Sequence, residues 1–372
     1  MRKPTGRRFL VRKPRLRPLG AGLVLLAVLS LSACLPRPLP RVLKIGLGAP
    51  FEGRYRTIGY DAVYAARLAV REINERGRIP GYRLALVAYD DRADPAMARA
   101  NAEALVTDPA VIAVIGHYRQ RTTEAAGAVY GEAGMPMIAV GGWLTPTDAG
   151  VWHLAPPRER LAEALLRHTA AFDRVALTGE GPVRSDLERV TSDGALMSVA
   201  SLSREGDPPA ADVVISLAEP YETAAALDAW RAAGWEGVLV GTTDLGASAF
   251  RQIAGTAAVG TRFVTPYPRP HDIPNTDVWI DAYRDVGPHV PEPSYYALPT
   301  YEAVHAVADA VRAAVEQGEH PGREVMVMTL SAASRTGSLG TLRWSPDGYW
   351  ADMPLHLYVW ESEGPRRVAR EP

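Results

Sequence analysis

Short apolar runs alternate with longer amphipathic segments from Val42 onward. The short runs predict strands at residues 42–47, 82–89, 111–115 and 137–140. The longer segments carry apolar residues at helical spacing and predict helices, the first of them at residues 60–76. Asp94-Pro95 opens the next helix, with the carboxylate as N-cap and the proline in the first turn. Strands and helices in this alternating order predict a parallel sheet that is covered on both faces.

The same alternation restarts after Val151 and predicts a second α/β unit of similar size. Its helices are expected at residues 158–172, 185–191, 223–233 and 247–253, and its strands at 174–178, 196–203, 212–216, 237–240 and 261–264. A proline-rich passage at 266–274 indicates a crossing between the units, and helices at 277–286 and 297–317 follow. The tail, from Thr336 to Trp360, predicts a hairpin and a final strand. A chain of 372 residues is also long enough for two domains.

The first 33 residues are typical of a bacterial export signal. They hold eight basic residues and no acidic one, and the apolar run from Leu19 to Leu31 is too short to span a bilayer as a helix. Leu31-Ser32-Ala33-Cys34 resembles a lipobox, which predicts lipidation of Cys34; the alternative is a short membrane anchor with an incidental cysteine. Arg7-Arg8 leaves twin-arginine export open beside the general route. Residues 34–41, with three prolines, are expected to form a stiff tether.

Composition and motifs exclude several classes of protein. Without residues 1–33 the chain keeps 33 basic and 42 acidic residues, and this net charge of −9 argues against nucleic acid as a partner. The third glycine of a dinucleotide fingerprint after Gly46-Leu47-Gly48 would fall on Phe51, and no Gly-Lys-Ser/Thr step exists for a phosphate-binding loop. No closely spaced histidines suggest a metal, and no nucleophile elbow is present. We therefore expect no enzyme, no cofactor and no metal site.

The remaining chemistry points to ligand binding at the ends of strands. Ligands of open parallel sheets gather outside the carboxyl ends of the strands. The candidate loops are residues 49–59, 116–121, 141–145, 180–184, 218–221 and 242–245. The loop from His117 to Arg121 precedes a helix N-terminus, where backbone N–H groups favour an anion.

Residues 43–106, with Ile115-Gly116 beyond them, resemble the N-terminal lobe of type I periplasmic solute-binding proteins, in the leucine/isoleucine/valine-binding group of ABC importers. The resemblance lies in Gly53 and Gly59, Ala69-Val70-Arg71-Glu72-Ile73-Asn74, Ile79-Pro80-Gly81, Asp90-Asp91 and Ile115-Gly116. The segment from Thr336 to Trp350 resembles a late motif of the same family. The matches cover most of residues 42–360 and are thinner in the second lobe.

The resemblance implies a ligand site in the first lobe. The loop that offers hydroxyl groups to a ligand carboxylate falls on Gln120, followed by Thr122 and Thr123, with Tyr118, Arg119 and Arg121 beside them. Both arginines could instead extend into solvent while backbone amides bind something neutral. The loop after the fourth strand falls on Gly141, Gly142 and Trp143, and Trp143 either walls the cleft or belongs to the core. An aromatic position before Gly59 falls on Ile58.

The second lobe supplies the acidic side of the implied site. A tyrosine position of the family falls on Glu219, with Tyr221 close by, and the acid that pairs with a ligand amino group falls on Asp244. Glu219 and Asp244 together suggest a cationic group on the ligand, although either could be an ordinary solvated acid. Tyr89, Tyr301 and Trp230 are most simply packing residues.

These observations predict an α/β protein with two doubly wound parallel-sheet lobes joined by three crossover segments. Lobe 1 is expected at residues 42–154 plus 268–336 and lobe 2 at 155–267 plus 337–372. The expected function is an extracytoplasmic solute-binding lipoprotein of an ABC importer, which captures a small polar solute such as an amino acid or amide. Its expected partners are the solute, the transmembrane permease subunits and the membrane, through the lipid, and the protein is expected to be a monomer. The alternative is a sensory or other non-transport ligand-binding lipoprotein with the same fold.

Overall fold

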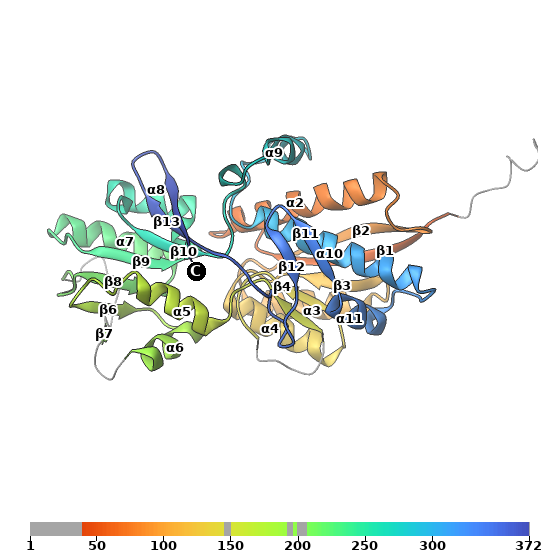
Figure 1. Cartoon of the computed structure of the whole chain (residues 1–372), viewed down its shortest axis with the longest axis horizontal. Helices are drawn as coiled ribbons and strands as arrows, with labels where there is room; N and C mark the ends of the chain where they lie inside the picture. Colours follow the sequence, from red (N-terminus) through yellow and green to blue (C-terminus); the bar gives the residue numbers. More distant parts are fainter. Residues whose placement is uncertain (1–38, 145–149, 192–195, 199–206, 372) are drawn as a thin grey trace, which may run out of the picture. The chain divides into compact units, whose positions relative to one another are not determined.

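Two β-sheets flanked by helices carry the elements that the alternating pattern predicts (Figure 1). The computed structural model describes residues 39–144, 150–191, 196–198 and 207–371. Residues from Arg41 onward form one unit of the chain, and Met1–Pro40 form another. The predicted signal segment, Cys34 and most of the tether lie outside the described residues.

The first sheet has the order β2-β1-β3-β4-β5, and all of its neighbouring strands are parallel. Its strands are β1 (Arg41–Ala49), β2 (Tyr82–Asp90), β3 (Val111–Ile115), β4 (Met137–Ala139) and β5 (Val151–His153). The strand order reverses between β1 and β3. In a sheet of this kind such a reversal opens a crevice at the carboxyl ends of the strands.

Helices cover both faces of the first sheet. Successive residues of a strand point to opposite faces, so neighbouring strand residues pack against different helices. Met137 and Ala139 belong to one apolar cluster, with α3 and α4, whereas Ile138 belongs to another, with α2 and α10. The helices are α2 (Arg56–Glu75), α3 (Pro95–Thr107), α4 (Gln120–Glu132), α9 (Asp277–Arg284), α10 (Ala297–Glu316) and α11 (Arg323–Ser331). The Asp94 side chain accepts the backbone N–H of Met97 at 2.9 Å, so the predicted N-cap of α3 is confirmed.

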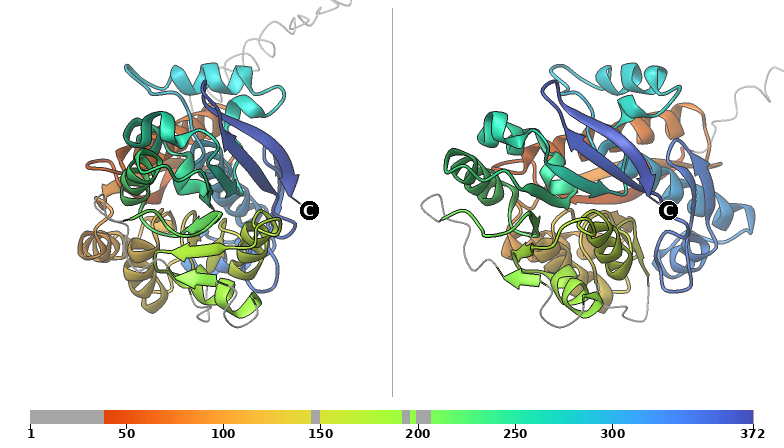
Figure 2. Two further views of the ribbon diagram at one scale, coloured as in Figure 1. Left: turned by 90° about the vertical axis from the view of Figure 1, so that its left-hand side faces the viewer. Right: turned by 60° about the vertical axis from the view of Figure 1, so that its left-hand side comes forward.

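The second sheet has the order β14-β13-β10-β9-β8-β6-β7. Its strands are β6 (Val175–Thr178), β7 (Leu196–Ser198), β8 (Val213–Ser216), β9 (Val238–Thr242), β10 (Arg262–Thr265), β13 (Leu355–Trp360) and β14 (Pro365–Glu371). The five strands from β10 to β7 are parallel, and β13 and β14 add an antiparallel edge (Figure 2). The tail therefore contributes one more strand than the sequence predicts.

Helices also lie on both faces of the second sheet. Leu177, Val213 and Ile215 pack against α5 and α6, whereas Val214 and Leu239 belong to the cluster that holds Trp230 of α7. The helices are α5 (Arg158–Arg167), α6 (Pro182–Val190), α7 (Pro220–Ala232) and α8 (Ser248–Ala254), with short 3-10 turns η1 (Thr243–Gly246), η2 (Gly255–Ala258) and η3 (Pro270–Asp272).

Three segments connect the two sheets. The chain leaves the first sheet after His153, returns between β10 and α9, and enters the second sheet again at Leu355. The strands β11 (Ser334–Gly337) and β12 (Gly340–Arg343) form a separate hairpin that contacts α10. We therefore propose residues 344–354 as the third crossing, in place of the predicted boundary between residues 336 and 337.

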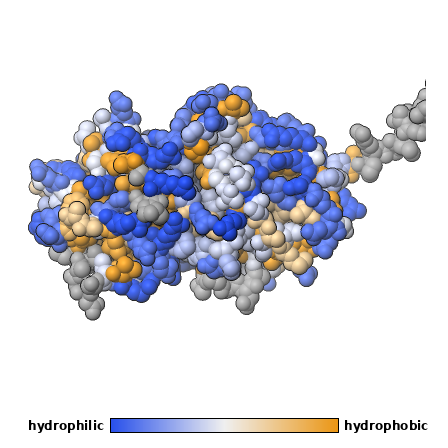
Figure 3. Space-filling model, in the orientation of Figure 1, coloured by the Kyte–Doolittle hydropathy of each residue, from blue (hydrophilic) through white to orange (hydrophobic). Residues whose placement is uncertain are grey.

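Some elements differ from the sequence prediction. The strand β5 and the helix α11 were not predicted, and α5 ends at Arg167 rather than at residue 172. Trp230 and Tyr301 are buried as expected, but Tyr89 is exposed, because it lies near the end of β2 at the edge of the sheet. None of the helices in the described part of the chain is both long and apolar enough to span a bilayer. The face seen in Figure 3 is largely hydrophilic, with apolar residues in small groups.

Candidate functional site

A cavity of about 420 Å³ opens among loops that follow the carboxyl ends of strands in both sheets. The first sheet contributes the loops after β3 and β4, and the second contributes the loops after β6, β8, β9 and β10. This is where parallel sheets place their ligands. The volume lies at the lower end of the range of about 300–1,000 Å³ that is usual for small-molecule sites.

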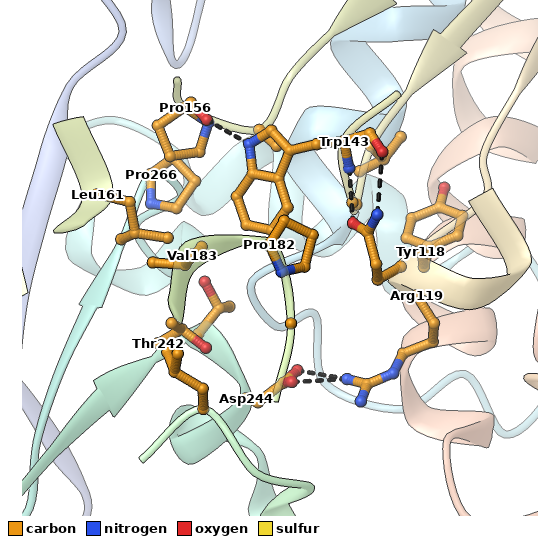
Figure 4. A pocket seen from close by; sticks show the side chains of 18 of the residues that line it. Tyr118, Arg119, Trp143, Pro156, Leu161, Pro182, Val183, Thr242, Asp244 and Pro266 are labelled. Atoms are coloured by element: carbon orange, nitrogen blue, oxygen red, sulfur yellow. Dashed lines mark hydrogen bonds and ion pairs between the residues drawn. The ribbon is translucent and has the colours of Figure 1, made fainter. Parts of the chain in front are cut away.

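Eight of the eleven predicted ligand-binding residues line this cavity. They are Tyr118, Arg119, Gln120, Gly141, Gly142, Trp143, Glu219 and Asp244. Several of them are drawn in Figure 4, which shows Trp143 and Arg119 approaching from the first sheet and Asp244 from the second. Arg121 also lines the cavity, with an exposed side chain.

The other three predicted residues lie outside the lining. Ile58 lies in the first turn of α2, on the side that faces the core, and is 8% exposed. Thr122 is buried, and its hydroxyl donates to the Arg119 carbonyl at 3.0 Å, so it stabilises the first turn of α4. The Tyr221 hydroxyl donates to the Arg54 carbonyl, and its ring packs edge-on against Tyr55.

Gln120 fixes Trp143 through both of that residue's backbone groups. The Trp143 N–H donates to Gln120 Oε1 at 2.8 Å, and Gln120 Nε2 donates to the Trp143 carbonyl at 3.0 Å. The indole N–H donates to the Pro156 carbonyl at 2.6 Å, as the dashed lines in Figure 4 mark. Trp143 is therefore a fixed wall of the cavity, and the amide of Gln120 is engaged in holding it.

The glycines before Trp143 allow the loop after β4 to approach the loop after β3. A Cβ on Gly141 would lie 2.2 Å from the Tyr118 carbonyl oxygen, so only glycine permits this approach. Gly142 has a φ of +78°, which side chains other than glycine rarely adopt. We conclude that both glycines shape the wall and leave the polar contacts to neighbouring groups.

Arg119 joins the two sides of the cavity. Its Nη1 lies 2.7 Å from both carboxylate oxygens of Asp244, and its Nη2 lies 2.7 Å from Glu219 Oε2. Arg119 is the N-cap residue of α4, Glu219 precedes α7, and Asp244 lies in η1 after β9. Two acids from the second sheet therefore bind one cation from the first.

The environment of Arg119 keeps it charged. Its side chain is only 14% exposed, and its guanidinium lies 4.4 Å from the centre of the Tyr55 ring. Burial lowers the pKa of Arg119, but Asp244 and Glu219 outweigh burial and raise it above its usual value. The Tyr55 hydroxyl also donates to Glu219, and burial, together with this bond, raises the pKa of Tyr55.

Three tyrosines form an aromatic floor. The rings of Tyr118 and Tyr296 are 5.6 Å apart, and those of Tyr267 and Tyr296 are 6.0 Å apart, both in edge-to-face arrangements. The Tyr118 hydroxyl is hydrogen-bonded to Thr300 at 2.7 Å, and the Tyr267 hydroxyl donates to the Val140 carbonyl at 2.8 Å. Burial raises the pKa of all three, so they remain neutral hydrogen-bonding groups.

A buried carboxylate holds Tyr296 in place. Asp61, on α2, accepts the backbone N–H groups of Ser294 and Tyr296 at 2.9 and 3.2 Å. Burial raises the pKa of Asp61 to about 7, against the opposing effect of these two bonds. The sequence offered one signal, since Asp61 falls beside apolar positions of a helix that packs inward.

Most of the apolar lining was not predicted from the sequence. The missed residues include Pro156, Leu161, Pro182, Val183, Tyr267 and Tyr296. Pro182 and Val183 fall inside the candidate loop at residues 180–184, but neither was predicted to contact the ligand. Tyr267 follows strand β10 and Tyr296 precedes α10, and both lie in segments that connect predicted elements. These residues are apolar or aromatic, so together they offer a surface that can contact the apolar part of a ligand.

The described residues contain no cluster of three or more histidine, cysteine, aspartate or glutamate side chains that could hold a metal ion. The arrangement supports binding through an aromatic wall, an apolar lining and a charged bridge between the two sides.

A sequence profile described as periplasmic binding protein matches residues 42–181 and 209–365. The leucine-specific-binding protein of Salmonella typhimurium is 25% identical over 352 residues, which cover 88% of this chain and 93% of that protein. An amino acid binding protein of Pseudomonas aeruginosa is 36% identical, but over 120 residues that cover 32% of each chain.

Solved structures of branched-chain amino acid binding proteins share the fold. The substrate-binding protein LivJ of Streptococcus pneumoniae, solved with isoleucine, has a TM-score of 0.75 at 20% identity, covering 89% of this chain and 99% of its own. The leucine-binding protein LivK of Thermotoga maritima has a TM-score of 0.76 at 17% identity, covering 88% and 98%. At these identities the likeness establishes the fold.

Proposed function

The chain belongs to the periplasmic binding protein family, and from this premise we propose that it is the solute-binding component of an ABC importer. In this proposal it acts by binding alone, as a monomer, and presents its closed form to the transmembrane subunits. The observation that carries the proposal is the cavity of about 420 Å³, whose lining comes from strand ends of both sheets. Such a cavity can open and close when the two lobes move about the crossing segments.

We propose that the solute is a small organic compound of amino-acid type: an amino acid, an amide or a related carboxylic compound. Relatives are named for leucine and for other amino acids, which makes this class the first to test. The fixed Trp143 wall and the buried tyrosines support a solute with an apolar body. Affinity in the micromolar range corresponds to about 8 kcal/mol, which a few polar contacts and an aromatic wall can supply.

A ligand panel tests this proposal. Amino acids, their deaminated counterparts, short amides, urea and polyamines are added to the purified protein, and the melting temperature and the radius of gyration are measured. We expect one chemical class to raise the melting temperature and to make the protein more compact. A flat response across the whole panel in both measurements would refute solute capture.

Matched tryptophan variants locate the binding. Trp143→Ala should abolish the ligand-induced rise in melting temperature. Trp344→Ala serves as the control, because Trp344 is also partly buried but packs against Trp152 away from the cavity. Both variants should be less stable than the wild type, but only the first should lose the response to the solute.

We further propose that the protein is a lipid-anchored extracytoplasmic lipoprotein. The basic segment, the apolar run and Leu31-Ser32-Ala33-Cys34 support a signal peptide that is cleaved before a lipidated Cys34. A single acyl chain binds a membrane only marginally, so stable anchoring requires at least two. Labelled fatty acid should be incorporated into the protein in a bacterial host, and Cys34→Ala should lose the label. Incorporation that survives Cys34→Ala would refute this site.

Sensing without transport is the second candidate. The observation that favours it is the pairing of Glu219 and Asp244 with Arg119, which departs from the amino-group site that the resemblance implied. Solute uptake by cells with and without the gene distinguishes the two functions. Uptake that depends on the gene supports transport, whereas unchanged uptake by a protein that still binds the solute supports sensing.

A further inference from the structure

The acidic side of the cavity is already occupied by a cation of the protein itself, because Arg119 pairs with both acids and compensates one of their two negative charges. Both oxygens of Asp244 lie 2.7 Å from Arg119 Nη1, and Glu219 Oε2 receives Arg119 Nη2 together with the Tyr55 hydroxyl. An ammonium group within hydrogen-bonding distance of Asp244 would lie next to this buried guanidinium. Like charges at such short range repel strongly in a site that is partly shielded from water.

The other acids of the cavity are poorly placed to receive a ligand ammonium at depth. Glu124 is exposed and accepts a hydrogen bond from Gln120 Nε2 at 2.6 Å. The Glu180 side chain is 89% exposed, at the mouth of the cavity. A group held by either acid would therefore lie near solvent, where an ion pair contributes little.

Much of the cavity lining is apolar. Leu161, Val183 and Val264 are buried side chains that line it, and Trp143 and Tyr296 add aromatic surface. The hydrogen-bonding groups of Trp143 are taken up by Gln120 and Pro156. This lining suits a branched or ring-bearing body and offers no unpaired acid beside it.

We propose that the solute of this cavity has an apolar body and lacks an ammonium group, and that Arg119 is the residue that determines this specificity. Arg119 occupies with its own charge the place that an amino group would take. The preferred class is therefore deaminated: branched or aromatic carboxylates, their oxo acids, or the corresponding neutral amides. This inference rests on the proposed function and names the class of its solute.

Two matched sets of compounds test the inference. Isothermal titration calorimetry compares leucine with isocaproate and the oxo acid of leucine, and phenylalanine with hydrocinnamate and phenylpyruvate. Hydrocinnamamide separates a neutral amide from a carboxylate. The compounds of each set share their apolar body. The ratio of the affinity of each deaminated compound to that of its amino acid therefore reports the effect of the amino group. We expect each deaminated compound, or the neutral amide, to bind the wild-type protein at least tenfold more tightly than its amino acid.

An arginine variant tests the role of the guanidinium. Arg119→Met keeps an unbranched stem but removes the guanidinium, which frees Asp244 and Glu219, so it should shift each ratio at least tenfold toward the amino acid. Arg251→Met is the charge-matched control, because Arg251 lies on α8 outside the cavity, and its ratios should equal those of the wild type. If Arg119→Met fails to fold, the wild-type ratios alone carry the test.

Three outcomes would overturn the inference. Amino acids that bind the wild type as tightly as their deaminated counterparts would do so, and would leave the proposed function standing. Ratios that Arg119→Met leaves unchanged would show that another group sets the preference. If no compound of either set binds, the inference is also overturned, and the broader ligand panel then decides separately whether the protein captures a solute.

Discussion

Replacing Gln120 tests whether this residue acts by holding Trp143. Gln120→Ala removes two hydrogen bonds, of 2.8 and 3.0 Å, between the side-chain amide and the backbone of Trp143. Each such neutral bond contributes about 1 kcal/mol, so the ordered conformation of the Trp143 loop loses about 2 kcal/mol of stabilisation. The bond from the indole to Pro156 remains, and the exposed bond to Glu124 adds little.

The cost should fall mainly on binding. A solute that packs against Trp143 must then order this loop as it binds. Its dissociation constant should therefore rise by about 5-fold to about 30-fold. Calorimetry with the tightest compound of the panel measures this, well below the melting temperature. Gln252→Ala is the matched control, since Gln252 is an exposed residue of α8 outside the cavity, and it should bind like the wild type.

Two results would refute this reasoning. An affinity of Gln120→Ala within twofold of the wild type would mean that the wall does not depend on Gln120. A loss of more than about 1,000-fold would exceed what two neutral hydrogen bonds supply, and would indicate that Gln120 contacts the solute directly.

Three other variants probe the supporting structure. Asp61→Asn should change the dependence of stability on pH. Because the pKa of Asp61 is raised to about 7, the folded wild type binds this proton more tightly than the unfolded chain does. The free energy of unfolding of the wild type should therefore fall by up to ~4 kcal/mol as pH rises from about 4 to about 7, and that of the variant should not. The difference between the two proteins isolates this group, because His153, whose pKa burial lowers to about 4, titrates with the opposite sign. Trp230→Ala should lower the free energy of unfolding by about 3–5 kcal/mol in denaturant, with solute affinity unchanged, because it empties a fully buried site under α7. Asp244→Asn should weaken the bridge to Arg119 by about 2 kcal/mol and enlarge the radius of gyration of the solute-free protein in scattering.

Each of these has a clear contrary result. Parallel pH profiles for the wild type and Asp61→Asn would show that the carboxyl titrates normally. An Asp244→Asn protein as compact as Asp228→Asn, a change of an exposed acid on α7, would show that the bridge does not hold the lobes together. A loss of solute affinity in Trp230→Ala that matches its loss of stability would mean that the core and the cavity are coupled.

Local patterns were enough to predict most of the fold. The strand at residues 111–115 has the predicted bounds, and the helix predicted at 297–317 ends one residue earlier, at Glu316. Both are runs whose periodicity is unambiguous. β5 was missed because a strand of three residues carries too little alternation, and its place in the sheet depends on pairing with β4. Topology, which follows from the order of elements, was easier to predict than these short edges.

The site was predictable only as far as strand ends determine it. The rule that ligands lie at the carboxyl ends of strands selected the loops that hold Trp143, Glu219 and Asp244. The pairing of Arg119 with both acids could not be predicted, because it joins residues 100 and 125 positions apart on different sheets. Gln120 was expected to bind the solute itself, and its two bonds to Trp143 depend on how closely two loops approach.

The aromatic floor has a consequence for how the protein would respond to solutes of different bulk. Tyr267 belongs to the segment that connects β10 to α9, so part of the surface under the solute is also part of the joint between the lobes. The Tyr267 hydroxyl donates a hydrogen bond to the Val140 carbonyl, which connects this segment to the first sheet. A substituent that displaces the Tyr267 ring would therefore change the angle at which the halves meet, and size selection would be measured as incomplete closure as well as weaker affinity.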